Sequence, residues 1–167
     1  MEIRQVRLED VDRLADSLSP EVSRTQVKRR YDESELGYRE MLIAELEGQI
    51  VGTVSTGGRG FQRTGSLRMF ALDVGSAFRN RGVGTALIEA VESAAVRRNL
   101  YEVNLEVSVD NVDAIRIYER LGYKRLPDRV TDTWNELDDL GNGQTVEESA
   151  WIMIKEFGDT EGIGTRG

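Results

Sequence analysis

Residues suited to binding an anion gather in the segment Arg79 to Gly84, which has the sequence RNRGVG and leads into an amphipathic stretch. A helix beginning here would present unpaired backbone N–H groups and the positive end of its dipole. Gly82 and Gly84 would let anion oxygens approach the backbone, and Arg79 and Arg81 would add positive charge. The segment therefore predicts a phosphate-binding helix start. The alternative is a glycine-rich helix start with two solvated arginines.

The spacing of these glycines excludes two familiar phosphate motifs. No Gly-Lys-Ser/Thr follows, as a Walker sequence would require, and the glycines do not match G-x-G-x-x-G. The chain also has no cysteine and no histidine, which excludes disulfides, thiolate nucleophiles, Ser-His-Asp triads and His-based metal sites. Acid–base chemistry near neutral pH therefore falls to Asp, Glu, Tyr, Lys, a terminus or water, and we expect no metal.

Length and charge narrow the classes of partner. The 167 residues carry a net charge of −8, which argues against general nucleic-acid binding. No apolar run approaches the roughly 20 residues that span a bilayer, and the start MEIRQVRLED lacks the apolar core of a signal peptide. We expect a cytoplasmic protein without nucleic-acid or membrane partners. Residues 1–157 are expected to form one domain and residues 158–167 a polar, Gly-rich tail.

Hydrophobic periodicity predicts the elements that must position the arginine- and glycine-rich segment. The expected helices are 9–18, 21–33, 82–99 and 112–121, and the expected strands are 2–7, 41–46, 49–56, 66–74, 102–107, 123–130 and 149–157. The stretch 135–144 is expected to be an exposed loop. A meander followed by one strand–helix–strand unit predicts an α+β fold, with a mixed, mostly antiparallel central sheet of about seven strands flanked by four helices.

Two segments in this order resemble a known enzyme family. The stretch LDVGSAFRNRGVGTALI contains Arg79-x-x-Gly82-x-Gly84, and LEVSVDNVDAIRIYERLGYKR contains Asn111, Tyr118 and Leu121-Gly122-Tyr123. Together they resemble the coenzyme-binding motif and the second motif of the GNAT superfamily of N-acetyltransferases, from about residue 67 to residue 125. The resemblance implies a GNAT-like fold, acetyl-CoA as co-substrate, an amine acceptor, and direct transfer in a ternary complex. A cysteinyl acyl-enzyme is impossible without cysteine.

The resemblance also implies which residues would bind acetyl-CoA. The backbone at Leu72, Asp73 and Val74 would pair with the pantetheine arm, beside a gap that relatives open between their fourth and fifth strands. A backbone N–H freed there would polarise the acetyl carbonyl. Asn111 would bind the cofactor or cap the helix that follows it. The pyrophosphate would lie on the backbone of Arg79, Asn80, Arg81, Gly82, Val83, Gly84 and Thr85.

The same resemblance implies an acid but leaves the base open. Tyr118 matches the tyrosine that protonates the departing thiolate in many relatives; the alternative is a tyrosine packed on an amphipathic helix. In some relatives a glutamate eleven residues before the position of Arg79 acts as the general base. This chain has Arg68 there, and an arginine cannot accept a proton. We take Glu106 as the leading replacement and Asp73 as the second, either directly or through water. Glu106 could instead be an outward-facing strand carboxylate.

The acceptor side is expected to be acidic. Relatives bind the acceptor between the early helices and the final hairpin, and here the stretch between Arg129 and Lys155 has no Lys or Arg. It has six acids: Asp132, Glu136, Asp138, Asp139, Glu147 and Glu148. Thr133 and Trp134 lie among them, so we expect an acidic, partly aromatic mouth. This pattern favours a cationic amine, such as a polyamine, an aminosugar, or a peptide lysine or N-terminus; the alternative is a solvated acidic loop.

Other functions stay open on the sequence alone. They are a non-catalytic acyl-CoA sensor of the same fold, an acyltransferase that uses another acyl-CoA, and an unrelated nucleotide-binding protein. Many relatives are dimers, so a homodimer is also expected.

Overall fold

The chain order of helices and strands is the one that the sequence predicts. The computed structural model describes residues 1–58 and 62–157, so the expected tail at 158–167 lies outside the described residues. The strands are β1 (Glu2–Gln5), β2 (Arg39–Leu46), β3 (Gln49–Gly57), β4 (Ser66–Val74), β5 (Glu102–Ser108), β6 (Lys124–Leu137) and β7 (Gly143–Glu156). The α-helices are α1 (Val11–Leu18), α2 (Arg24–Glu35), α3 (Val83–Arg97) and α4 (Val112–Arg120), and short 3-10 turns cover Leu8–Asp10 and Ser76–Phe78.

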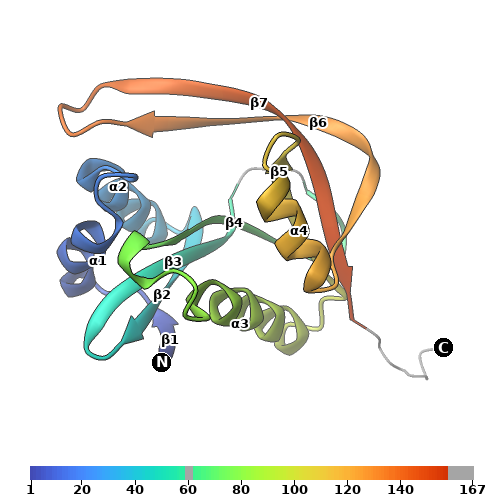
Figure 1. Ribbon diagram of the computed structural model, residues 1–167, viewed down its shortest axis with the longest axis horizontal. Helices are drawn as coiled ribbons and strands as arrows, with labels where there is room; N and C mark the ends of the chain where they lie inside the picture. The colour runs from blue at the N-terminus through green and yellow to red at the C-terminus, as the bar shows by residue number, and fades with distance from the viewer. Residues whose placement is uncertain (59–61, 158–167) are drawn as a thin grey trace.

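One sheet runs through the molecule in the order β1-β2-β3-β4-β5-β7-β6. β4 and β5 form its parallel pair, and the other neighbouring strands of the described chain are antiparallel. α3 connects β4 to β5, as a parallel pair requires a long crossover. The expected mixed, mostly antiparallel sheet flanked by four helices is therefore confirmed (Figure 1).

Helices cover the two faces of the sheet in pairs, and each pair has its own apolar core. α3 and α4 pack on one face in a core that includes Leu87, Val91 and Ile115. α1 and α2 pack on the other, where Leu14 and Val27 are fully buried. Adjacent strand residues contribute to opposite cores, as the twofold alternation of a strand requires. No helix of the described residues is long and apolar enough to cross a membrane.

Gly52 sets how closely α3 approaches the sheet. A Cβ at this position would lie 3.1 Å from the Val83 side chain, 3.2 Å from that of Leu87 and 3.1 Å from the carbonyl oxygen of Asp73. The absence of a side chain therefore lets the first turn of α3 pack directly against β3. This contact fixes the start of α3 beside the end of β4, where the arginine- and glycine-rich segment lies.

The final hairpin is longer than the sequence pattern indicates. β6 and β7 have 14 residues each, and their pairing continues through Asn135↔Thr145 to Leu137↔Gly143. The expected loop at 135–144 is thus wrong at both ends, and the turn is confined to residues 138–142. The alternation of apolar and polar residues that marks a strand is weak here, because polar residues occupy both faces of the hairpin. The hairpin extends across the molecule toward α2 (Figure 1), and its tip is bonded to the start of that helix.

Candidate active site

The two central strands separate part-way along their length. β4 and β5 pair at Ser66↔Glu102, Leu67↔Val103 and Arg68↔Asn104. The ladder then stops, although β4 continues to Val74 and β5 to Ser108. The edge of β4 beyond Arg68 is therefore open toward β5, in the place where the family resemblance implies a gap. An extended chain such as a pantetheine arm could pair with this edge as an added strand.

A β-bulge lies on the open part of β4. Ser55 of β3 pairs with Phe70, but Thr53 pairs with Asp73, so β4 contains one extra residue between these pairs. Ala71 has a φ of 53°, in the left-handed region that non-glycine residues rarely adopt. Such bulges disrupt the ladder locally and redirect the backbone, and they are common beside active sites. Here the redirected backbone borders the gap.

The start of α3 has the features of an anion cradle. Gly82 has a φ of 84° and no side chain of the described residues caps the helix. The first helical bond at this end runs from the Ala86 N–H to the Gly82 carbonyl at 3.0 Å. The N–H groups of residues 83–85 precede that bond and need partners from outside the helix. Thr85 is exposed and Val83 is buried, so backbone rather than side chains dominates the surface offered to a ligand.

The two arginines of the cradle are half-exposed and reach surface carboxylates. Arg79 lies 3.7 Å from Glu21 and donates its Nε to the Val74 carbonyl at 3.3 Å. Arg81 lies 3.4 Å from Glu47. Exposed pairs of this kind contribute about 1 kcal/mol or less, so both guanidiniums can leave their partners for a phosphate at small cost.

Tyr118 and Asp73 approach the gap from different elements. Tyr118 is on α4, partly buried against the core under α3, and its ring meets that of Tyr123 edge-on at 5.8 Å between centroids. Burial, and then the charge of Asp73, raise the pKa of Tyr118 to about 12. The phenol is therefore protonated throughout the neutral range, as a proton donor must be. Asp73 also accepts a hydrogen bond from Arg30 of α2 at 2.8 Å.

Asn111 stands at the first turn of α4 and caps it. Its side-chain oxygen accepts a hydrogen bond from the Ala114 N–H at 3.2 Å. The capping role considered from the sequence is therefore present. A role toward a cofactor stays a prediction.

Arg68 and Glu106, the arginine at the expected base position and the leading replacement base, form an ion pair. Arg68 donates its Nε to both carboxylate oxygens of Glu106 at 3.0 and 3.3 Å, and the two side chains are 11% and 4% exposed. Its guanidinium also donates to the Gly57 carbonyl at 3.2 Å and stacks on Phe70, 4.3 Å from the ring centroid. Glu106 is therefore neither outward-facing nor solvated, which excludes the alternative considered above.

Sequence reasoning missed this pair, although a signal for it exists. Arg68 pairs with Asn104 in the parallel ladder, and Glu106 is two residues beyond Asn104, on the same face. A correct strand register would have predicted that the two charges meet. Asn104 itself was also missed: it is 1% exposed, donates to Ser66 Oγ at 2.6 Å and has a buried side-chain oxygen without a partner among the described residues.

The acids of the final hairpin serve different purposes. Asp139 accepts hydrogen bonds from the Thr25 N–H and hydroxyl at 3.0 and 3.2 Å, and so holds the hairpin tip on α2. Asp138 accepts from the backbone of Leu140 and Asn142 within the turn. These two acids are engaged in structure, which corrects the expectation that all six would form an acidic mouth. Asp132 differs, because burial and then the charge of Glu106 raise its pKa.

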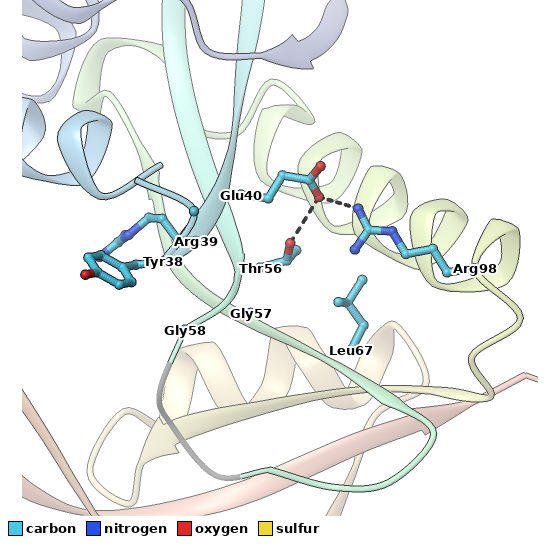
Figure 2. A pocket seen from close by; sticks show the side chains of 9 residues that line it. Tyr38, Arg39, Glu40, Thr56, Gly57, Gly58, Leu67 and Arg98 are labelled. Atoms are coloured by element: carbon cyan, nitrogen blue, oxygen red, sulfur yellow. Dashed lines mark hydrogen bonds and ion pairs between the residues drawn. The ribbon is translucent and has the colours of Figure 1, made fainter. Parts of the chain in front are cut away.

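A separate cavity of about 430 Å³ opens near the other end of α3 (Figure 2). Glu40 accepts hydrogen bonds from Thr56 at 3.3 Å and Arg98 at 2.5 Å beside it. Arg98 follows the last residue of the 15-residue α3, and a helix of that length spans about 22 Å. The cavity is therefore distinct from the cradle at the start of the helix. Its lining is Gly37, Tyr38, Arg39, Glu40, Thr56, Gly57, Gly58, Leu67 and Arg98.

The sequence profile of one family covers both the cradle and the segment around Tyr118. The acetyltransferase (GNAT) family matches residues 8–123, more than half of the chain. The chain belongs to the acetyltransferase (GNAT) family. The earlier resemblance is thereby confirmed, and the cradle, the gap and Tyr118 of this GNAT chain all lie within the matched residues.

Solved structures of GNAT enzymes share the whole fold. The ribosomal-protein-alanine N-acetyltransferase of Brucella melitensis is 20% identical, with a TM-score of 0.66 over 94% of this chain and 100% of that chain. The PaiA N-acetyltransferase of Thermoplasma acidophilum, solved with coenzyme A, is 16% identical, with a TM-score of 0.65 over 93% and 98%. An aminoglycoside 6'-acetyltransferase type Ii is 21% identical, with a TM-score of 0.67 over 93% and 97%. At these identities the likeness shows the fold.

Proposed function

We propose that this protein transfers an acetyl group from acetyl-CoA to a primary amine, by direct attack in a ternary complex. The observation that carries the proposal is the gap between β4 and β5, which has the uncapped start of α3 at one end and Tyr118 and Glu106 beside it. The acceptor proposed is a cationic amine, such as a polyamine, an aminosugar, or a peptide lysine or N-terminus. The structural neighbours carry names with different acceptors, so fold likeness does not choose among them.

The cofactor proposal rests on backbone groups. The N–H groups of residues 79–85 would cradle the pyrophosphate, with Arg79 and Arg81 as counter-charges. The open edge of β4 at Leu72, Asp73 and Val74 would pair with the pantetheine arm. Asn111 would contact the cofactor beyond its capping bond. When bound, acetyl-CoA would place its thioester in the gap.

Acid and base would approach the reaction centre from opposite faces of the sheet. Tyr118 belongs to the α3–α4 side. Phe70 and Asp73 pair with Ser55 and Thr53 of β3, and Arg30 of α2 bonds to Asp73, so these residues face the α2 side. Glu106 joins that side through its bond to Arg68, which stacks on Phe70. An acceptor entering past α2 would thus meet carboxylates before it reaches the thioester.

The chemistry divides among three groups of the chain. Glu106, directly or through water, would accept the proton of the attacking amine as the N–C bond forms. A backbone N–H at the bulge near Ala71 would donate a hydrogen bond to the acetyl oxygen as it gains charge. Tyr118 would donate its proton to the sulfur as the C–S bond breaks. Asp73 is the second candidate for the base.

Thiol release from acetyl-CoA across a panel of primary amines tests the proposal. Turnover that needs both an amine and acetyl-CoA, and that falls in Tyr118→Phe and Glu106→Gln while coenzyme A binding persists, is the expected result. A wild-type protein that binds coenzyme A by calorimetry but releases no thiol with any amine would overturn it.

One observation favours a second function. Arg68 donates its Nε to both carboxylate oxygens of Glu106, so an attacking amine would have to compete with that guanidinium for the carboxylate. A domain that binds acyl-CoA as a sensor needs no base, so the ion pair would be harmless there. Calorimetry with acetyl-CoA and other acyl-CoA compounds, run beside the thiol assay, separates a sensor from an enzyme that uses a different acyl donor.

A further inference from the structure

Not every carboxylate on the α2 side of the gap has an ion-pair partner among the described residues. Glu106 is paired with Arg68, and Asp73 with Arg30 at 2.8 Å. Asp132 of β6 lies close enough to Glu106 for the two charges to interact. Among the residues that the structure describes, no Arg or Lys comes within ion-pair distance of Asp132. Asp132 therefore has no ion-pair partner among the described residues; Arg68 acts on its charge only from a longer distance, and Glu148 adds a second negative charge beside it.

Strand register places Asp132 on the same face as Glu106. Glu106 pairs with Ile152 of β7, and Asp132 pairs with Glu148 of the same strand. Ile152 and Glu148 are four residues apart, and even spacing along a strand keeps side chains on one face. Ala150, between them, is fully buried and small. The face thus carries Glu106 at the gap and, farther along the hairpin, the neighbouring carboxylates of Asp132 and Glu148.

The next residue on this face of β6 suits the same ligand. Trp134 is two residues beyond Asp132, pairs with Val146 and is partly buried. Its indole N–H donates to Glu136 at 3.2 Å. An aromatic face beside a carboxylate is a favourable setting for an alkylammonium group. Trp134 therefore gives a reason, independent of the acids, to expect a cation here.

We propose that Asp132 determines acceptor specificity by binding a second positive charge of the acceptor, while Glu106 receives the amine that reacts. The proposal deepens the proposed function and rests on it. It names the acceptor chemistry as an amine with a further cationic group along the same chain. Arg68 supports this assignment, because it forms its ion pair with Glu106 and acts on Asp132 only from a longer distance.

Matched acceptors that differ in one charge test the proposal. We would measure kcat/KM for 1,5-diaminopentane and for 5-amino-1-pentanol with the wild-type protein, Asp132→Asn and Asp132→Glu. Wild type should prefer the diamine, Asp132→Asn should reduce that preference about tenfold, mostly through KM, and Asp132→Glu should restore most of it. A loss shared equally by both acceptors, or no loss, overturns the proposal.

Glu147→Gln is the matched control. Glu147 is exposed, belongs to the same hairpin and pairs with Thr133, so its side chain lies on the opposite face from Asp132. The Glu147→Gln variant removes one negative charge from the protein, as Asp132→Asn does. An equal change of preference in both variants would show a general charge effect and would overturn the assignment to Asp132.

Two further experiments distinguish failure of the proposed function from failure of the inference, and a polypeptide acceptor from a small-molecule acceptor. If wild type turns over no amine, the proposed function fails; diamine binding to the coenzyme A complex, measured by calorimetry, then tests the inference alone through the same tenfold loss in Asp132→Asn. Peptides beginning Ala-Arg and Ala-Gln form a second matched pair. Charge preference that depends on Asp132 in this pair supports a polypeptide source, and in the diamine pair a small-molecule source. Its absence from both pairs overturns the inference.

Discussion

Arg68 and Glu106 form an ion pair beside the gap between β4 and β5, with Arg68 Nε 3.0 Å from Glu106 Oε1. Arg68 occupies the position on β4 where the family resemblance implies a glutamate that acts as the general base. The carboxylate of Glu106 lies on the neighbouring strand β5 instead. A carboxylate therefore still borders the gap, but the guanidinium of Arg68 is paired with it. In the proposed mechanism, removal of a proton from the acceptor would therefore depend on both residues together.

Exchanging the two charges should separate stability from catalysis. Glu106→Gln leaves a buried guanidinium without its partner, so we expect the free energy of unfolding to fall by about 3 kcal/mol. The double variant Arg68→Glu with Glu106→Arg restores the pair and should recover most of that loss. It also returns a glutamate to β4. Urea unfolding and thiol release measure the two effects.

We expect the exchanged variant to release thiol at least about tenfold faster than Glu106→Gln, because a carboxylate again borders the gap. A double variant that regains stability but stays as inactive as Glu106→Gln would show that the base must stand on β5. That result would contradict the expectation that a carboxylate on β4 can replace the one on β5.

Tyr118→Phe should lower kcat by about 100-fold with little change in coenzyme A affinity, because it removes one proton donor. Since the pKa of Tyr118 is raised to about 12, loss of its proton should not cause a fall in rate below about pH 11. Tyr123→Phe is the control, because Tyr123 donates its hydroxyl to Glu92 at 2.8 Å and has a structural role. Equal kcat losses in both variants would refute the acid assignment.

Burial of Tyr118 also predicts how stability depends on pH. Its folded pKa of about 12 lies above the ordinary value of 10.0, so the native state holds this proton more tightly than the unfolded chain. The resulting stabilisation is complete below pH 10 and is lost as pH rises toward 12. In Tyr118→Phe the stability should therefore fall less steeply over this range, while the raised pKa of Tyr123 acts in both proteins. Parallel curves from urea unfolding would contradict this.

The sequence predicts the cradle and the order of elements because both depend on local patterns. Gly82 adopts the left-handed conformation that its residue type permits, and Asn111 caps α4 as asparagine often does. The bulge at Ala71 could not be predicted, because alanine has no local preference for positive φ. The Arg68–Glu106 pair needed a strand register that periodicity does not specify.

The hairpin shows the same limit on a larger scale. Residues 135–144 are polar and contain Gly141-Asn142-Gly143, which is typical of a loop. Their pairing is fixed instead by contacts with a distant helix: Ser23 donates its hydroxyl to the Leu137 carbonyl at 2.5 Å, and the Leu137 N–H donates to Gln26 at 2.8 Å. Contacts across more than a hundred residues leave no trace in local composition.

Replacing each of the two glycines of the cradle by alanine should have a different effect, on stability for Gly82 and on coenzyme A binding for Gly84. Gly82→Ala forces a side chain into a φ of 84°, and should cost about 1 kcal/mol of stability. Gly84 lies in α3, and a Cβ there would be 3.8 Å from Val74, an ordinary contact. Gly84→Ala should therefore keep full stability but weaken coenzyme A binding about tenfold, if phosphate oxygens approach this backbone. Calorimetry showing unchanged affinity for Gly84→Ala would argue against the pyrophosphate assignment.

Asp139 offers a test of the acceptor side that leaves the cofactor side untouched. Its carboxylate accepts hydrogen bonds from the Thr25 N–H and hydroxyl, so Asp139→Ala loosens the hairpin tip at the start of α2, although the bonds of Leu137 to Ser23 and Gln26 remain. We expect the acceptor KM to rise several-fold and the coenzyme A dissociation constant to stay the same, because the cradle lies at α3. Asp138→Ala, which loosens only the turn itself, is the neighbouring control. If Asp139→Ala weakened coenzyme A binding as much as acceptor binding, the hairpin would not belong to the acceptor side alone.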